Sequence, residues 1–305
     1  NFNQIKTNLK NFLRAKPEFV DYDFEGSALN TLIDVLSYNT YYNAMYTNMT
    51  TNEMFLDSAQ LRNNVVARAK MIGYTPSSAK GAEATIKAVV TPTTNVASVT
   101  ISSNTLFLST IDGIDYKFTT DRAYALLQQD NYTANNIIIK EGEPLSERIA
   151  VTGSSNQRFI LSNFNIDLSG LKVDVQTSTS NSSVTVFSRA TDLTEVKSTS
   201  NVFFVDENED GKYELIFGDG VLGKALSAGN IVKPKYRVVN GSLTNGANNF
   251  VSPSTLGGQS NFTVTVALAA RNGANAESIE SIKFNAPKSF QRQGRAVIKS
   301  DYSRL

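Results

Sequence analysis

The chain has 305 residues, and its 29 Lys and Arg nearly balance its 28 Asp and Glu, which leaves a net charge of +1 at neutral pH. A charge this small provides no general field that attracts nucleic acid or an anionic membrane, so neither is expected as a partner. The sequence contains no Cys and no His, which excludes thiolate and Ser-His-Asp catalysis and metal sites built from those residues. Carboxylate pairs, a Lys base and carboxylate-bound hard cations are the catalytic means that remain.

The N-terminal part of the chain is predicted to be helical as far as Gly73. From Leu29 onwards, apolar side chains recur at helical spacing for more than five turns, which indicates one long helix. Ser27 is the expected N-cap of that helix. A second helix is expected after Asp57, which stands three residues before Gln60 in the manner of a capping box.

From Glu83 onwards the hydrophobic period changes to two, which predicts strands with one buried and one solvated face. Clear examples are the stretches 84–90, 171–176 and 262–266. No helix of the usual crossover length separates successive strands, so a doubly wound parallel sheet is not expected. Helical character returns at about 276–292. The predicted fold class is therefore α+β, with a β-rich and mostly antiparallel central body and a short helical C-terminal segment.

These changes of period divide the chain into four predicted regions. They are a helical arm for bundle formation, a β-rich domain, a second β-rich region with a Phe-Gly-Asp-Gly turn, and a helical linking segment, at residues 1–80, 81–190, 191–270 and 271–305.

The segment YELIFGDGVLGK, which starts at Tyr213, fits the G-x-G-x-x-G fingerprint of dinucleotide-binding proteins letter for letter. That fingerprint requires a helix at its third glycine, since the helix N-terminus holds the pyrophosphate. Gly223 instead leads into a short stretch that ends in glycine and then into a predicted strand, 231–239. Nucleotide binding is therefore not expected.

The acidic stretch 206–211 matches the first half of a calcium loop, but Phe217 stands at the twelfth position, where a bidentate Glu is needed. A weak ion site with a partial ligand set stays open as an alternative. We interpret the stretch as the turn between two strands, 202–205 and 213–217, because Asn, Asp and Gly suit tight turns. No catalytic, cofactor-binding or metal residue is assigned, and the predicted structural turn residues are Gly211, Gly218, Asp219, Gly220 and Gly223.

A small acidic cluster, Asp21, Asp23 and Glu25, precedes the long helix. Two of these carboxylates form a conceivable glycosidase pair, whose separation a sequence does not give. We interpret the cluster as favouring the positive N-terminus of the helix.

Aromatic and Met side chains crowd the long helix. They either pack against the second helix of the same chain, or they form a surface larger than one helical partner covers, as at the centres of protein interfaces. We favour docking of this helix into a bundle with other chains. The predicted interface consists of Leu29, Leu32, Ile33, Leu36, Tyr38, Tyr41, Tyr42, Met45, Tyr46 and Met49.

Three blocks, in order along the chain, resemble the baseplate J-like family. The first carries Phe24-Glu25-Gly26, Asn52-Glu53, Phe55-Leu56, Arg62 and Gly73-Tyr74-Thr75-Pro76. The second carries Phe217-Gly218-Asp219-Gly220, Gly223 and Tyr236-Arg237. The third carries Ala276-Glu277-Ser278, Asn285-Ala286-Pro287, Gly294-Arg295-Ala296-Val297 and Asp301-Tyr302. Within the family, the chain is most similar to the wedge proteins of T-even-type contractile-tailed bacteriophages.

The resemblance implies a structural protein of the tail baseplate wedge in the virion, with no enzymatic activity and no cofactor. It implies a late protein, assembled in the host cytoplasm, that helps build the ring around the central hub and couples to sheath contraction and genome ejection. The implied partners are a second copy in a homodimer, other wedge proteins through a helical bundle, neighbouring wedges, and sheath-initiating and hub proteins. The family pattern runs past Asp301-Tyr302, so a further domain is expected beyond Leu305.

Two alternatives to a baseplate scaffold remain open at this point. The first is a carbohydrate-binding β module of a tail fibre, although the chain has no Trp to stack on a sugar. The second is a carboxylate-dependent cell-wall glycosidase that uses the acidic cluster before the long helix.

Overall fold

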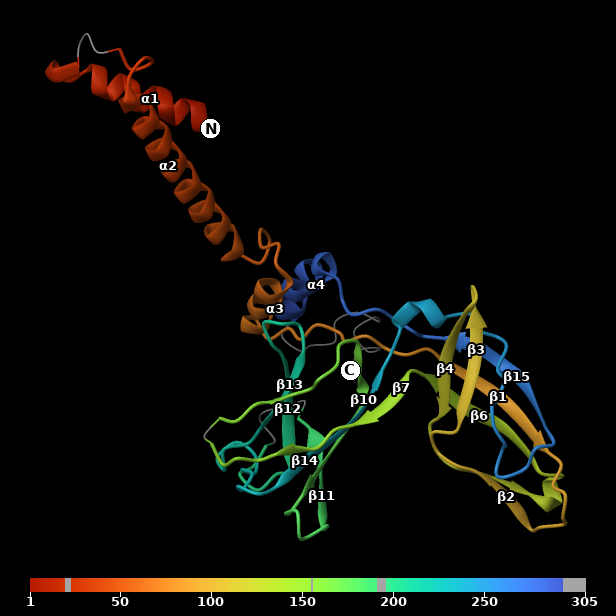
Figure 1. Cartoon of the computed structure of the whole chain (residues 1–305). Helices are drawn as coiled ribbons and strands as arrows, with labels where there is room; N and C mark the ends of the chain where they lie inside the picture. The colour runs from red at the N-terminus through yellow and green to blue at the C-terminus, as the bar shows by residue number, and fades with distance from the viewer. Residues whose placement is uncertain (20–22, 155, 191–195, 293–305) are drawn as a thin grey trace. The chain divides into compact units, whose positions relative to one another are not determined.

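The computed structural model describes residues 1–19, 23–154, 156–190 and 196–292 (Figure 1). Within it the chain forms two compact units. The first contains residues 1–74 together with the chain from Ile282 onwards, and the second contains residues 75–281. The helices lie at the two ends of the sequence and the strands between them, so the predicted α+β class with a mostly antiparallel body is confirmed.

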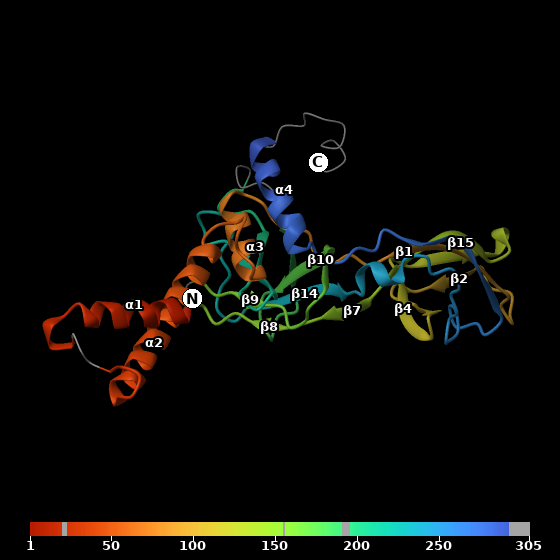
Figure 2. The same ribbon diagram turned by 90° about the horizontal axis from the view of Figure 1, so that it is seen from above.

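The first unit is helical. Its elements are α1 (Phe2–Arg14), the 3₁₀ turn η1 (Pro17–Phe19), α2 (Ala28–Glu53), α3 (Arg62–Met71) and most of α4 (Ile279–Arg292). Helix α1 packs against the first half of α2, where the ring centroids of Phe2 and Tyr38 are 4.6 Å apart and Lys6 Nζ lies 2.5 Å from Asp34 Oδ1. Helix α4 runs beside α3 in both ribbon views (Figures 1 and 2). Among the described residues, no helix combines the length and apolarity needed to cross a bilayer.

Both predicted helix starts differ from the structure in their capping. Ser27 is the N-cap of α2, but its hydroxyl donates to the Phe24 carbonyl oxygen instead of accepting from the helix. The predicted capping box at Asp57 is wrong, because α3 begins only at Arg62 and its N-cap residue makes no side-chain hydrogen bond. A carboxylate from the end of α2, Glu53, replaces it. The predicted stop is confirmed, since Gly73 adopts a φ of 78° directly after α3.

The first sheet of the second unit has five antiparallel strands in the order β15-β1-β6-β4-β3. Their alternating apolar side chains enclose a core that includes the edge-to-face pair Phe118 and Phe250. A two-stranded ribbon, β2 with β5, closes over this core. The elements are β1 (Glu83–Val90), β2 (Ser98–Ile101), β3 (Leu106–Ile111), β4 (Ile114–Thr120), β5 (Tyr124–Leu127), η2 (Gln128–Asp130), β6 (Thr133–Glu141) and β15 (Phe262–Arg271).

The second sheet has the order β7-β14-β10-β11-β12-β13-β9, and β8 also pairs with β14. The predicted hairpin around the acidic turn is confirmed, because β12 and β13 pair antiparallel. Residue 190 ends the second predicted region, and strands before and after it share this sheet, because β11 pairs with β12. Strand β15, in contrast, pairs with β1 of the first sheet. The elements are β7 (Glu143–Ser146), β8 (Ile149–Ala150), β9 (Phe159–Ile160), β10 (Ile166–Gln176), β11 (Val184–Arg189), β12 (Val202–Glu207), β13 (Tyr213–Phe217), β14 (Ile231–Val238) and η3 (Gly241–Thr244).

A buried polar joint connects the two sheets where β6 passes into β7 and β14 leaves the second sheet. The fully buried carboxylate of Glu141 accepts hydrogen bonds from the backbone N–H and the side-chain amide of Asn240, the latter at 2.8 Å. Burial raises the pKa of Glu141, and the Asn240 hydrogen bonds oppose that rise. Arg237, on β14, donates to Thr119 Oγ1 of β4 at 2.5 Å. Asp167, at the start of β10, accepts from the Gly81 N–H.

The Gly-Asp-Gly segment after β13 forms a compact loop. Asp219 Oδ1 accepts the N–H groups of Val221 and Leu222, both at 2.9 Å, and these bonds lower the pKa of the carboxyl. Gly218 packs so tightly against Gly223 that no side chain fits between them. The chain then reaches β14 without an intervening helix, so the helix that a dinucleotide fingerprint requires at its third glycine is missing from this described segment.

Candidate assembly surface on the helical arm

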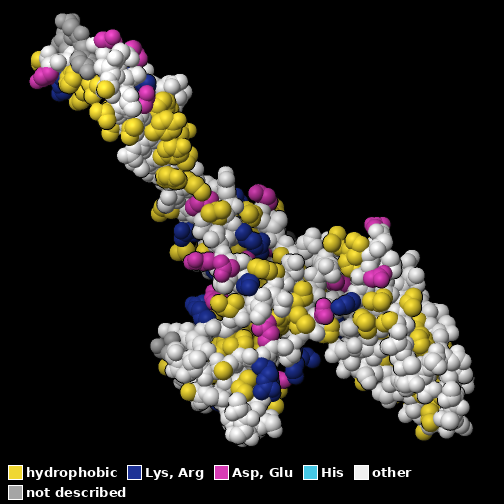
Figure 3. Space-filling view, in the orientation of Figure 1, with side chains coloured by type: hydrophobic (Ala, Val, Ile, Leu, Met, Phe, Trp, Pro, Cys, Tyr) yellow, Lys and Arg dark blue, Asp and Glu magenta, His cyan; other side chains and the backbone are white. Residues whose placement is uncertain are grey.

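One face of α2 carries a continuous line of exposed apolar side chains, which we call the α2 seam. Its residues are separated alternately by three and four positions, which is the a/d spacing of a coiled coil. Each is between 40% and 60% exposed, and the apolar line along the arm is visible in Figure 3. The seam consists of Val35, Tyr38, Tyr42, Met45 and Met49.

The tyrosine rings on and beside the seam pack against one another. Rings four residues apart stack along the helix, with centroids 5.9 Å apart for Tyr38 and Tyr42 and 6.2 Å apart for Tyr42 and Tyr46. Tyr41 meets Tyr42 edge to face at 5.8 Å. Rings already held in place lose little rotamer entropy on binding, which favours their use as interface anchors.

The predicted interface residues differ in how far they are exposed. Leu32, Leu36 and the aromatic and Met residues from Tyr38 to Met49 are all exposed. Ile33 is only 2% exposed because it lies on the face of α2 that packs against α1, so it does not belong to the exposed surface. Leu29 is half-buried. The sequence analysis missed Val35, which is 60% exposed, although the three-and-four spacing of the seam identifies it.

The face of α2 opposite the seam is polar but uncharged. No charged residue occurs between Val35 and Asn52. Several hydroxyls on this helix are satisfied within it, because they donate to carbonyl oxygens four residues earlier at 2.7–2.8 Å, in Ser37, Thr40, Thr47 and Thr51. A hydroxyl that already has an internal acceptor costs less to remove from water. This face is therefore also suited to burial against a neighbouring helix.

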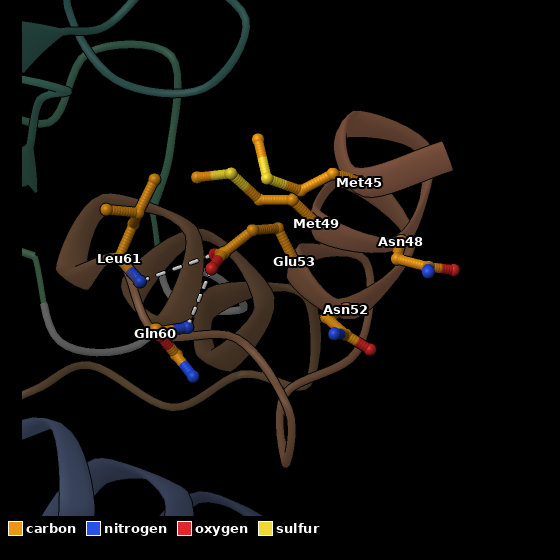
Figure 4. Close-up of a pocket in the computed structure, with 7 residues that line it drawn as sticks. All are labelled: Met45, Asn48, Met49, Asn52, Glu53, Gln60 and Leu61. Carbon is orange, nitrogen blue, oxygen red and sulfur yellow. Dashed lines mark hydrogen bonds between the residues drawn. The ribbon is translucent and has the colours of Figure 1, made fainter. Parts of the chain in front are cut away.

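The end of α2 is fastened to the start of α3 by Glu53 (Figure 4). Its carboxylate accepts the N–H of Gln60 at 2.8 Å, the N–H of Leu61 at 3.3 Å, and the side-chain amide of Asn64 at 2.8 Å. The Asn64 hydrogen bond, followed by the one from the Gln60 N–H, lowers the pKa of Glu53. We call this α2–α3 corner, residues 53–61, the elbow. Glu53 stabilises the N-terminus of α3 that no local cap serves.

A pocket of about 330 Å³ opens at the elbow. In Figure 4 the side chains of Met45 and Met49 extend to the same side as Leu61, whereas Asn48 and Asn52 point the other way. The elbow pocket is thus walled by two seam residues from α2 and by one residue at the start of α3. Its lining is Met45, Asn48, Met49, Asn52, Glu53, Gln60 and Leu61.

Replacing Glu53→Gln is expected to lower the thermal stability of the helical unit at neutral pH and to leave it nearly unchanged in acid. A pKa lowered by folding means that the Glu53 carboxylate contributes stability above its unfolded pKa, and that this contribution is lost as the pH falls through the lower folded pKa. Circular dichroism melts of wild type and variant between pH 7 and about 3 measure the difference. Equal differences at every pH would contradict the role of the charge.

The acidic cluster before α2 is engaged in local structure. Asp23 Oδ1 accepts the N–H groups of Glu25 and Gly26, and the carboxylate of Glu25 pairs with Lys10. Asp21 lies outside the described residues. In the acidic turn, the Asn208 side chain accepts the N–H groups of Asp210 and Lys212.

Comparison with known proteins identifies the helical arm. Residues 1–74 match the model of the family described as "Baseplate wedge protein gp6-like, helical domain". These residues are therefore similar to the helical domain of gp6-like baseplate wedge proteins. The α2 seam and the elbow both lie within the matched gp6-like residues. The predicted resemblance to baseplate wedge proteins is therefore confirmed.

One curated protein similar to this chain is the baseplate wedge protein gp6 of Enterobacteria phage T4. It is 29% identical over 330 aligned positions, which include 99% of this chain and 48% of the relative. The chain thus spans about half the length of the curated relative it matches. A solved structure of the anti-feeding prophage baseplate aligns with 96% of this chain and 60% of its own chain, at 13% identity and a TM-score of 0.31.

Proposed function

We propose that this chain is a structural component of a contractile phage tail baseplate wedge, without catalytic activity. The observation that carries the proposal is the exposed α2 seam, because α2 is a long helix whose apolar side chains at coiled-coil spacing are each 40–60% exposed among the described residues. Its place within a gp6-like helical domain supports the same function.

In this proposal α2 enters a helical bundle with a second copy of the chain and with helices of other wedge proteins. The seam takes one helical neighbour, since three-and-four spacing presents a narrow stripe. The internally satisfied hydroxyls allow a second neighbour on the opposite face. Between Tyr38 and Asn52 every residue of α2 is exposed, so both faces are available.

The wider role follows from the relationship to the T4 wedge protein. The chain would join neighbouring wedges around the hub, contact the sheath-initiating and hub proteins, and couple to sheath contraction in the virion baseplate. The T4 relative is named as a baseplate wedge protein, and this chain matches 48% of its length. None of the described residues shows a feature that favours the carbohydrate-binding or glycosidase alternative.

The native mass of the full chain tests the proposal. Sedimentation velocity is expected to show self-association that depends on concentration, and a larger complex when the other wedge proteins of the same phage are added. Burial of the apolar seam drives self-association, and the internally satisfied hydroxyls on the opposite face allow a further helix to pack there. A chain that stays monomeric at all concentrations, with and without those proteins, would contradict a bundle-forming scaffold.

A further inference from the structure

The α2 seam does not by itself define how far one helix is shifted along another. Coiled coils fix their register with charged flanking residues or with a single buried polar residue in the seam. Here the chain has no charge from Val35 to Asn52, and the seam contains only Val, Tyr and Met. A slip of one heptad therefore exchanges Tyr for Met at two seam positions, and every seam contact remains free of charge. A feature outside the seam is therefore needed to distinguish one register from another.

The elbow pocket provides such a feature. Met45 and Met49 are seam residues, and they also form one wall of the pocket. Leu61, which is 48% exposed, faces them from the start of α3, and Glu53 holds its backbone N–H at 3.3 Å. Near Tyr38 a partner side chain also meets Phe2 of α1, whereas at Tyr42 it meets α2 alone. At the elbow it meets Met45 and Met49 of α2 together with Leu61 at the start of α3. Among the described residues, this combination occurs once per arm.

The chemistry of the pocket fits an apolar side chain. Two flexible thioethers and one Leu form its exposed walls, and Met adapts its shape to the group it meets. Glu53 does not act as a free anion there, because three donors already occupy its carboxylate. A cationic or polar side chain would find no free hydrogen-bond or ion-pair partner on Glu53 and would lose its hydration on entering the pocket.

We propose that the elbow pocket fixes the register of the arm by taking an apolar side chain from the α2 seam of a second copy of this chain. This inference rests on the proposed bundle function. A second copy is the chosen occupant because it presents an uncharged seam of the same length, so that pairing covers both seams at once without charge repulsion. In a parallel pair, the unshifted register lets each copy's pocket take a seam side chain from the other copy. A slip of one heptad leaves one of the two pockets beyond the end of the partner's seam, because the last seam residue is Met49 and α2 ends at Glu53.

Distance measurements between labelled copies test this register. The chain has no Cys, so copies carrying Thr40→Cys and copies carrying Thr51→Cys can each receive one of two orthogonal spin labels. Both positions lie opposite the seam and are exposed. Electron–electron dipolar spectroscopy on the mixture then reads only mixed pairs. The expected result for the otherwise unchanged chain is one narrow distance.

Two variants alter the pocket without altering the seam. Leu61→Ala removes one wall, and Leu61→Asp places a charge there. We expect both to keep self-association within about tenfold and to give several distances, because a slip of one heptad moves the helix by about 10 Å. The matched control is Val186→Asp, which changes another exposed apolar residue, 67% exposed on β11, and should keep the single distance.

Each other outcome overturns the proposal. An unchanged single distance in both Leu61 variants would show that the register is set elsewhere. Loss of association in both, with the helical content retained, would show that the pocket provides affinity and not register. If the unchanged chain does not pair with itself but does bind other wedge proteins, the second copy is the wrong occupant, while the proposed function survives. If it binds neither, the proposed function fails as well.

Discussion

Tyr42→Glu together with Met45→Glu is expected to abolish self-association through α2 while the rest of the chain stays folded. Both side chains lie on the α2 seam and are about 40% exposed, so neither contributes much to the core of the isolated chain. In the paired state each glutamate would be buried without a partner, at a cost of about 2 kcal/mol or more. The cost of the two buried glutamates together raises the dissociation constant of the pair at least about a thousandfold.

Sedimentation velocity measures this loss, and thermal melts report whether the β-rich unit is intact. The matched control is Ala44→Glu together with Thr51→Glu, which adds the same charge to the opposite face of the same helix. That variant should still pair with itself, because the seam is unchanged. Equal loss of pairing in both double variants would mean that charge anywhere on α2 disrupts pairing, and the seam would then have no special role.

Gly218→Ala is expected to destabilise the second unit by about 3 kcal/mol or more, because the added methyl group has no space. A Cβ atom at this position would lie 2.2 Å from the carbonyl carbon of Gly223 and 2.6 Å from its Cα. Those atoms belong to the backbone of the neighbouring loop, which cannot move aside as a flexible side chain does. The loop and the end of β13 would both have to shift.

Urea unfolding followed by circular dichroism measures that change. Gly170→Ala is the control, since a Cβ atom there meets nothing within 4 Å and the residue has no left-handed backbone. We expect the control to lie within about 0.5 kcal/mol of wild type. A Gly218→Ala chain as stable as the control would show that the contact between Gly218 and Gly223 is not tight in solution.

The sequence predicted those elements whose signals are local. The long helix, the period-two strands and the turn between β12 and β13 depend on residues close together in the chain, and all three are confirmed. The side-chain hydrogen bonds of Asp219 are equally local, because they join it to residues two and three positions later. Periodicity and turn chemistry act within a few residues, so a single sequence contains them.

The features that depend on distant contacts were not predictable in the same way. The cap of α3 comes from Glu53, seven or more residues before the N–H groups it accepts. Ile33 looks like its neighbours in the sequence, and only the position of α1 distinguishes its buried face. The pairing of β1 with β15 joins residues about 180 positions apart, and no local pattern specifies such a partner. Val35 differs from these cases, since its spacing alone identifies it.

The buried polar joint between the two sheets has a mechanical consequence. A load applied to one sheet reaches the other through Glu141, Arg237 and Asp167, whose hydrogen bonds join strand ends of both sheets. Twisting one sheet against the other would pull the fully buried Glu141 carboxylate away from its hydrogen bonds with Asn240. Leaving a buried charged group without its partners costs more than about 1–3 kcal/mol, so we expect this joint to resist rotation of one sheet against the other.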